Sequence, residues 1–227
     1  WWVWPALLSL AFSLVNIAYI VFGFTETLPK EKRAKNIYTG LSEAWNLVSP
    51  PALFNFRLVR GIPLRELKHL QLLGYVYFLF LFLFSGLEYT LTFLTHLRFN
   101  YDARQQGSML LYIGLVMALV QGGLGRRVPV GKERQVAIVG LLLNIPAFII
   151  IGLAQSIPVL YIGLTLYSIA PATVVPCLLA LAAACGRTDQ KGAITGTLRS
   201  LGSLSRALGP LISSLGMYKG VSSPVCS

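Results

Sequence analysis

Residues 75–94 read YVYFLFLFLFSGLEYTLTFL, an apolar stretch that contains a single carboxylate, Glu88. A helix of about 20 apolar residues spans the roughly 30 Å hydrocarbon core of a bilayer, so this stretch predicts a transmembrane helix. A charged side chain at that depth costs at least about 2.5 kcal/mol, and it therefore faces protein or water instead of lipid. The stretch thus indicates a membrane protein with a polar interior.

The overall composition agrees with a membrane protein. The 227 residues are 55% hydrophobic and 12% charged, and their mean hydropathy is +0.68. These values exclude an ordinary soluble domain. The net charge of +11 would suggest a nucleic-acid partner in a soluble protein. Here the lysines and arginines fall between apolar segments, so we expect cationic loops and no nucleic acid.

The sequence contains no pattern that predicts an enzyme or a bound cofactor. Neither a nucleotide-binding loop nor a nucleophile elbow occurs. The three cysteines, Cys177, Cys185 and Cys226, are too few and too scattered for a disulfide framework or a metal site. We therefore expect no enzyme, no cofactor and no metal.

The apolar segments divide the chain into membrane spans and connections. We predict six transmembrane helices, over residues 1–24, 72–97, 108–125, 136–154, 157–185 and 193–217. Residues 25–71 form a long polar connection, residues 72–217 a bundle of five helices, and residues 218–227 a tail without a further span. Because the chain begins at Trp1 inside an apolar run, we interpret its first helix as the last helix of a preceding bundle.

The connections differ strongly in their content of lysine and arginine. Residues 25–71 carry eight, residues 126–135 carry four, and Arg187 and Lys191 follow in the next connection on that side. The opposite side has three, Arg98, Arg104 and Lys219. Because cytosolic loops are enriched in lysine and arginine, this asymmetry places residues 25–71 in the cytosol.

The long connection also contains apolar residues, such as Leu53 and Phe56, among its basic ones. Two interpretations fit them equally well. The segment is either an amphipathic helix lying on the anionic leaflet or an apolar patch packed under the transmembrane helices.

The polar residues around Glu88 share one helical face. They are Ser85, Glu88, Tyr89, Thr92 and His96, at helical spacing. A carboxyl group held among apolar side chains can bind and release a proton, as a proton-coupled carrier requires. The alternative is a protonated or paired glutamate that only ties two helices together.

The last predicted span carries a complementary polar face. It consists of Thr195, Arg199, Ser203, Arg206, Pro210 and Ser213. Arg206 lies about 20 Å into the span, too deep for its side chain to reach the interface, so it needs an anionic partner. Glu88 is one candidate partner and an anionic substrate is the other. Arg199 is closer to the cytosolic end and could reach the interface instead.

Glycines and prolines interrupt the predicted spans at points where a helix could bend. Gly209 and Pro210 lie in the last span, and Pro171 and Pro176 lie in the span before it. Small residues allow close helix packing in membranes, and proline is tolerated there. We predict that these four residues contribute to gating.

Several short motifs resemble one family in their wording and order. They are Glu26-Thr27-Leu28-Pro29 followed by basic residues, Gly122-Gly123-Leu124-Gly125-Arg126-Arg127, Gly131-Lys132-Glu133-Arg134, and the run from Gly202 to Gly209-Pro210. Together they resemble the major facilitator superfamily, especially its drug:proton antiporter-like branch. The resemblance implies an all-α membrane protein, the carboxy-terminal part of a bundle of twelve helices, with helices six to eleven present.

The resemblance also implies a function, which we hold as the leading interpretation. It is a multi-pass secondary active transporter for amphiphilic organic ions, chiefly organic anions or drug-like compounds, coupled to protons or a counter-ion by alternating access. Glu88 would carry the proton, Arg206 and Arg199 would hold the anion, and Tyr89, Thr92 and Ser203 would line the cavity. The membrane would be the plasma membrane or an intracellular one. The alternative is a truncated, non-transporting membrane scaffold in which Glu88 and Arg206 form a structural pair.

Overall fold

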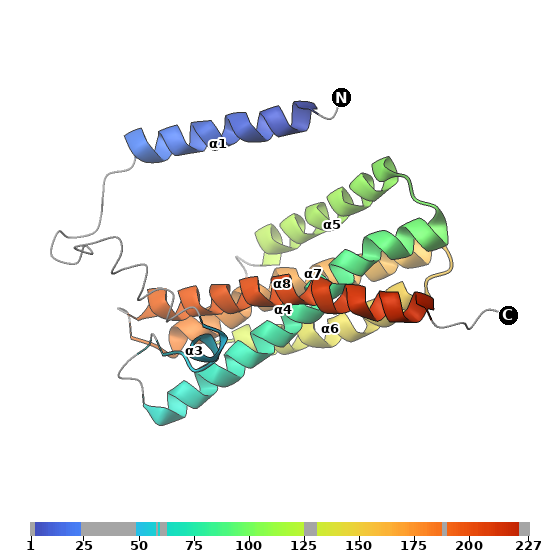
Figure 1. Cartoon of the computed structure of the whole chain (residues 1–227). Coiled ribbons are helices and arrows are strands. Elements are labelled where there is room, and N and C mark those ends of the chain that lie inside the picture. The colour runs from blue at the N-terminus through green and yellow to red at the C-terminus, as the bar shows by residue number, and fades with distance from the viewer. Residues whose placement is uncertain are drawn as a thin grey trace. The chain divides into compact units, whose positions relative to one another are not determined.

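The computed structural model describes residues 3–23, 49–57, 59, 63–124, 131–187 and 190–222. Its elements are α1 (Val3–Gly23), α3 (Pro50–Phe54), α4 (Leu64–Phe99), α5 (Ala103–Leu124), α6 (Glu133–Leu153), α7 (Ile157–Ala184) and α8 (Lys191–Ser222), shown in Figure 1. The described residues are thus almost entirely helical, which confirms the predicted all-α class.

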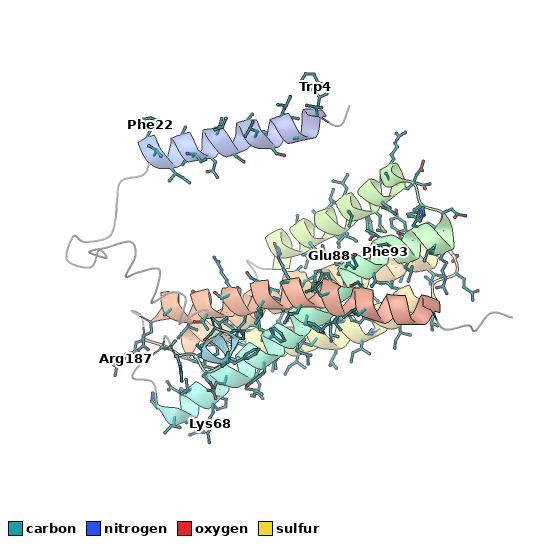
Figure 2. All side chains as sticks on the ribbon, in the orientation of Figure 1. Trp4, Phe22, Lys68, Glu88, Phe93 and Arg187 are labelled. Carbon is teal, nitrogen blue, oxygen red and sulfur yellow. The ribbon has the colours of Figure 1, made fainter. Side chains whose placement is uncertain are left out.

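The chain divides into two compact units, Trp1–Ala44 and Trp45–Ser227. Within the first unit the structure describes α1, a helix whose side chains are exposed from Trp4, 71% accessible, to Phe22, 89% accessible (Figure 2). A helix of this apolar composition suits a lipid or protein environment. The motif Glu26-Thr27-Leu28-Pro29 lies outside the described residues, as do Gly125 to Arg127.

Five described helices are long and apolar enough to cross a membrane. They are Ala6–Gly23, Leu64–Phe99, Ala103–Gly123, Glu133–Leu153 and Ile157–Ala184. The sixth predicted span is present as helix α8, but by composition α8 does not reach this apolar criterion. Arg199, Arg206 and several glycines and serines lower its hydropathy.

Helix α4 begins at Leu64, eight residues before the predicted start of its span. The apolar run begins near residue 72, and the residues before it include charged ones. Those residues are good helix formers, so the helix continues through them. Leu70 is buried and Leu67 is half-buried, whereas Lys68 is exposed, so this extension is itself amphipathic.

Helix α7 occupies the centre of the second unit, with contacts to α4, α5, α6 and α8 (Figure 1). Tyr167 illustrates how it holds α4. Its ring stacks on Phe84 with centroids 4.5 Å apart, and its hydroxyl donates a hydrogen bond to the Phe84 carbonyl at 3.0 Å. Helix α5 is attached to α7 by the hydrogen bond of 2.8 Å between Tyr112 and Thr165.

The short helix α3 and the residues after it pack against α4 and α8. Leu53, Phe56 and Val59 are all buried. A Cβ atom added to Gly74 of α4 would lie 2.9 Å from the Phe56 ring, so this glycine makes the room that the ring occupies. For these residues the structure supports the second interpretation, an apolar patch packed under the helices.

Helices α4 and α8 approach closely at Gly86 and Gly209. A Cβ atom on Gly209 would lie 2.8 Å from the Phe82 carbonyl oxygen and 3.0 Å from the Gly86 nitrogen. The Ser85 hydroxyl adds a hydrogen bond of 3.4 Å to the Ser205 carbonyl. Small residues therefore set this crossing, as they commonly do between membrane helices.

The prolines predicted to contribute to gating lie inside continuous helices. Pro171 and Pro176 are within α7, and Pro210 is within α8. Each still leaves the carbonyl four residues earlier without its usual N–H donor. Their part in gating stays a prediction.

Candidate functional site

A pocket of about 370 Å³ lies between α4, α5 and α8. Its lining comprises Ser85, Glu88, Tyr89 and Thr92 from α4, Leu110 from α5, and Arg206 and Pro210 from α8. Glu88 is on the part of α4 that follows its crossing with α8 (Figure 2). The structure therefore brings together residues that the sequence analysis selected on two separate helices.

A second pocket of about 210 Å³ adjoins the first, because Arg206 lines both. Its other lining residues are Tyr77 and Leu81 from α4 and Arg199, Gly202 and Ser203 from α8. Of the predicted site residues, Arg199 and Ser203 lie here. Below, we call this smaller pocket the arginine pocket and the larger one the Glu88 pocket.

The crossing of α4 and α8 explains why the two faces meet. Glu88 follows Gly86 by two residues, and Arg206 precedes Gly209 by three. The glycines let the two backbones approach, so the side chains beside them face a common space. Any residue bulkier than glycine at this crossing would move the carboxylate and the guanidinium apart.

The site contains three charged residues, Glu88, Arg199 and Arg206, and all three side chains are exposed. Among the described residues, no ion pair or hydrogen bond joins Glu88 to Arg206, and Arg199 has no acidic partner either. A structural pair between Glu88 and Arg206 was the arrangement that the scaffold alternative required. The structure instead leaves both groups facing the pockets.

The serine and threonine hydroxyls of the site are used by the backbone. Thr92 donates to the Tyr89 carbonyl at 2.8 Å, and Ser203 donates to the Arg199 carbonyl at 3.1 Å. Ser85 donates to the carbonyls of Phe82 and Ser205, at 3.3 and 3.4 Å. These side chains line the pockets, but their hydroxyl hydrogens are already directed at carbonyl oxygens.

Three other selected residues lie away from both pockets. His96 is near the end of α4, where its Nδ1 is 3.2 Å from the Tyr101 carbonyl oxygen. Of the two prolines in α7, Pro171 is buried and Pro176 is exposed, and neither lines the pockets. The shared helical face of α4 therefore selected pocket-lining residues near the crossing with α8, but at the end of α4 it selected His96, which lines neither pocket.

Tyr77 and Leu81 are lining residues that the sequence analysis missed. They lie in an uninterrupted run of aromatic and leucine residues, in which no polar spacing marks a face. A clue was present, since Tyr77 precedes Glu88 by eleven residues, which is three helical turns. The phenol could have been assigned to the Glu88 face on that spacing.

Comparison with known proteins places this arrangement in a family context. The model of the Major Facilitator Superfamily matches residues 1–210. Major facilitator superfamily domain-containing protein 10 of Homo sapiens is 51% identical over 208 residues, which are 90% of this chain and 46% of that protein. Its counterpart in Mus musculus is 48% identical over 209 residues, with the same coverage. The chain thus spans about half the length of these relatives.

A solved structure is similar in fold as well as in sequence. The crystal structure of the human organic anion transporter MFSD10 (TETRAN) has a TM-score of 0.79 and 49% sequence identity to this chain. The similarity covers 89% of this chain and 49% of that chain.

Proposed function

Because this chain belongs to the major facilitator superfamily, a family of membrane transporters, we propose that it takes part in secondary active transport of amphiphilic organic anions, coupled to protons or to a counter-ion. One observation carries the proposal. Glu88 and Arg206 line the same pocket between helices α4, α5 and α8 without forming an ion pair within the described part of the chain.

Arg206 supplies the anion preference. A guanidinium keeps its positive charge under all working conditions and can donate two parallel hydrogen bonds to the oxygens of one anionic group. In a state of the transport cycle that excludes bulk water from the pocket, its attraction for an anion would be stronger than at a protein surface. The name of the human relative of known structure, an organic anion transporter, is consistent with this preference.

Glu88 supplies the coupling. When its carboxylate is ionised, it competes with the substrate anion for electrostatic interaction with Arg206, and protonation of the carboxylate removes that competition. Proton binding and anion binding are then linked within one pocket. Alternating access would move this pocket between the two sides of the membrane, with Gly209, Pro210, Pro171 and Pro176 as points where α7 and α8 can bend.

Uptake of a permanently charged aromatic anion tests the proposal directly. The purified full chain in proteoliposomes should take up radiolabelled naphthalene-1-sulfonate, and unlabelled sulfonate should compete better than the neutral naphthalene-1-sulfonamide. Arg206→Ala should lower sulfonate uptake by about tenfold or more, because hydrogen bonds to a charged group are lost. Arg104→Ala removes a cation that lies outside both pockets and should leave uptake unchanged.

Two results would contradict the proposal. The first is an absence of uptake above that of empty liposomes. The second is equal competition by the sulfonate and the sulfonamide, which would show that Arg206 does not select for charge.

A further inference from the structure

The two adjoining pockets differ in chemistry. The arginine pocket is lined by two guanidinium groups, Arg199 and Arg206, and by no carboxylate. The Glu88 pocket is lined by one carboxylate and by Arg206, which it shares with the arginine pocket. The rest of its lining consists of Tyr89, Leu110, Pro210, Ser85 and Thr92. An anion therefore experiences attraction on one side of Arg206 and repulsion from Glu88 on the other.

Tyr77 gives the arginine pocket a hydroxyl that the backbone does not use. Its ring is buried at 4% exposure, yet the residue lines the pocket, and its hydroxyl makes no hydrogen bond within the described part of the chain. The hydroxyls of Ser203, Ser85 and Thr92 are all directed at carbonyl oxygens. Tyr77 is thus well suited to donate to a bound anion.

Gly202 makes this placement of Tyr77 possible. A Cβ atom on Gly202 would lie 3.0 Å from Cε1 of Tyr77 and 3.3 Å from its hydroxyl oxygen. Gly202 follows Arg199 by three residues and precedes Arg206 by four, so the three residues share one face of α8. The phenol hydroxyl therefore lies over the turn between the two arginines.

From these contacts we propose that the site binds its substrate in one direction. The anionic group occupies the arginine pocket, held by Arg199, Arg206 and the Tyr77 hydroxyl, and the apolar body extends past Arg206 into the Glu88 pocket against Tyr89 and Leu110. The Tyr77 hydroxyl then donates a hydrogen bond to the anionic oxygens beside the two arginines. Leu110 contributes to selecting the length of the substrate's apolar body. This inference rests on the proposed function, since it assumes that the site takes organic anions.

The volumes fit this division. The arginine pocket, at about 210 Å³, is the smaller one and suits a compact anionic group. The Glu88 pocket, at about 370 Å³, has more room for a hydrocarbon or aromatic body. In the reverse orientation the anionic group would lie beside Glu88 and the apolar body between two arginines, and both placements are unfavourable.

A series of linear alkanesulfonates separates the two ends of the site. Equilibrium binding of butane- to octanesulfonate is measured by calorimetry on the purified full chain in lipid nanodiscs, with empty nanodiscs as the blank. For the unmodified chain, each added methylene that becomes buried should raise the affinity by about fourfold. Binding is measured instead of transport, so that the orientation is tested separately from the transport function.

Variants at the two ends should change this series in different ways. Tyr77→Phe and Arg199→Gln should weaken every sulfonate by the same factor, about tenfold, because each removes a hydrogen bond to a charged group. Leu110→Asn should leave butanesulfonate nearly unchanged and reduce the gain per methylene for the longer members. Tyr75→Phe deletes the hydroxyl of an exposed tyrosine on the same helix that lines neither pocket, and it should match the unmodified chain.

Arg199→Gln keeps the test informative if Tyr77→Phe perturbs the packing of the buried ring. Unchanged binding in both Tyr77→Phe and Arg199→Gln would overturn the proposed orientation, as would an equal loss of all chain lengths in Leu110→Asn. The expected binding pattern without any uptake of naphthalene-1-sulfonate would support the orientation and count against the transport proposal alone.

Discussion

At the scale of single residues, the site is defined by charges that no other described residue pairs with. A glutamate and an arginine within reach of one pocket would gain free energy by pairing if the site served only structure, because unpaired charges at membrane depth are costly. Among the described residues they do not pair, and Arg199 adds a second free cation. In the proposed function, charges kept apart in this way bind a proton and an anionic ligand.

Glu88→Gln should abolish the dependence of transport on a pH gradient while the chain remains folded and inserted. The amide has nearly the shape of the carboxyl group but cannot give up a proton in the working range. The measurement is uptake of naphthalene-1-sulfonate, which stays ionised throughout, into proteoliposomes with and without an imposed gradient. Gradient dependence equal to that of the unmodified chain would remove Glu88 from the coupling and support its helix-tying role.

Arg206→Lys should recover only part of the uptake that Arg206→Ala loses. Lysine restores the positive charge, but it lacks the planar fork that donates two hydrogen bonds to one anionic group. We therefore expect the three forms to rank arginine, lysine, alanine in their affinity for naphthalene-1-sulfonate. If lysine performs as well as arginine, the site uses a point charge, and the bidentate contact has no part in recognition.

At the scale of elements, the crossing of α4 and α8 determines where the site lies. The backbones approach at Gly86 and Gly209, and this contact places Glu88 opposite the turns of α8 that carry Arg206. The contact at Gly209 involves backbone atoms of α4, which cannot move aside as a flexible side chain can. Packing at this point should therefore be sensitive to a single added methyl group.

Gly209→Ala should lower the free energy of unfolding by about 1–3 kcal/mol, the usual cost of overpacking a close contact. It should also lower the affinity for naphthalene-1-sulfonate, because it moves α8 away from α4. Gly196→Ala on the same helix is the matched control, since nothing lies within 4 Å of its added Cβ atom. Denaturant unfolding of both variants in the same detergent compares them, and equal stability would show that the crossing adapts.

At the scale of the whole molecule, the distribution of basic residues predicts the orientation in the membrane. Lys68, near the start of α4, and Arg187, after α7, lie at the same end of the bundle (Figure 2). One pocket lined by Glu66 and Arg187 supports this placement. Both residues belong to the side that the lysine and arginine count assigns to the cytosol. Most of residues 25–71 lie outside the described part of the chain, so their location stays a prediction.

Accessible cysteines on opposite sides test this orientation. In a background with Cys177, Cys185 and Cys226 replaced by serine, Gln135→Cys should react with an impermeant maleimide only after the plasma membrane is permeabilised. Gln105→Cys, at the other end, should react in intact cells if the protein is at the plasma membrane, or only after detergent opens internal membranes. Both positions are exposed in the structure. Labelling of Gln135→Cys in intact cells would reverse the orientation.

The sequence by itself determined the class of the protein and the position of its helices. Apolar runs such as residues 75–94 can only be stable in a bilayer as helices, because a lipid-exposed backbone must satisfy its own hydrogen bonds. The sequence also singled out Glu88 and Arg206, because a charged side chain within an apolar run is costly in a bilayer and is usually functional. The apolar runs did not determine the helix ends. Helix α4 begins at Leu64 and passes through charged residues, because a helix needs no apolar composition outside the membrane core.

Only the tertiary structure decided which polar faces meet and which groups pair. The sequence left Glu88 either paired with Arg206 or available to a substrate, and the distance across α4 and α8 depends on the packing at Gly86 and Gly209. It also left Leu53 and Phe56 either on the leaflet or under the helices, and their burial places them under the helices. Tyr77 lay hidden among aromatic neighbours because helical periodicity assigns a residue to a face, whereas only packing shows what that face contacts.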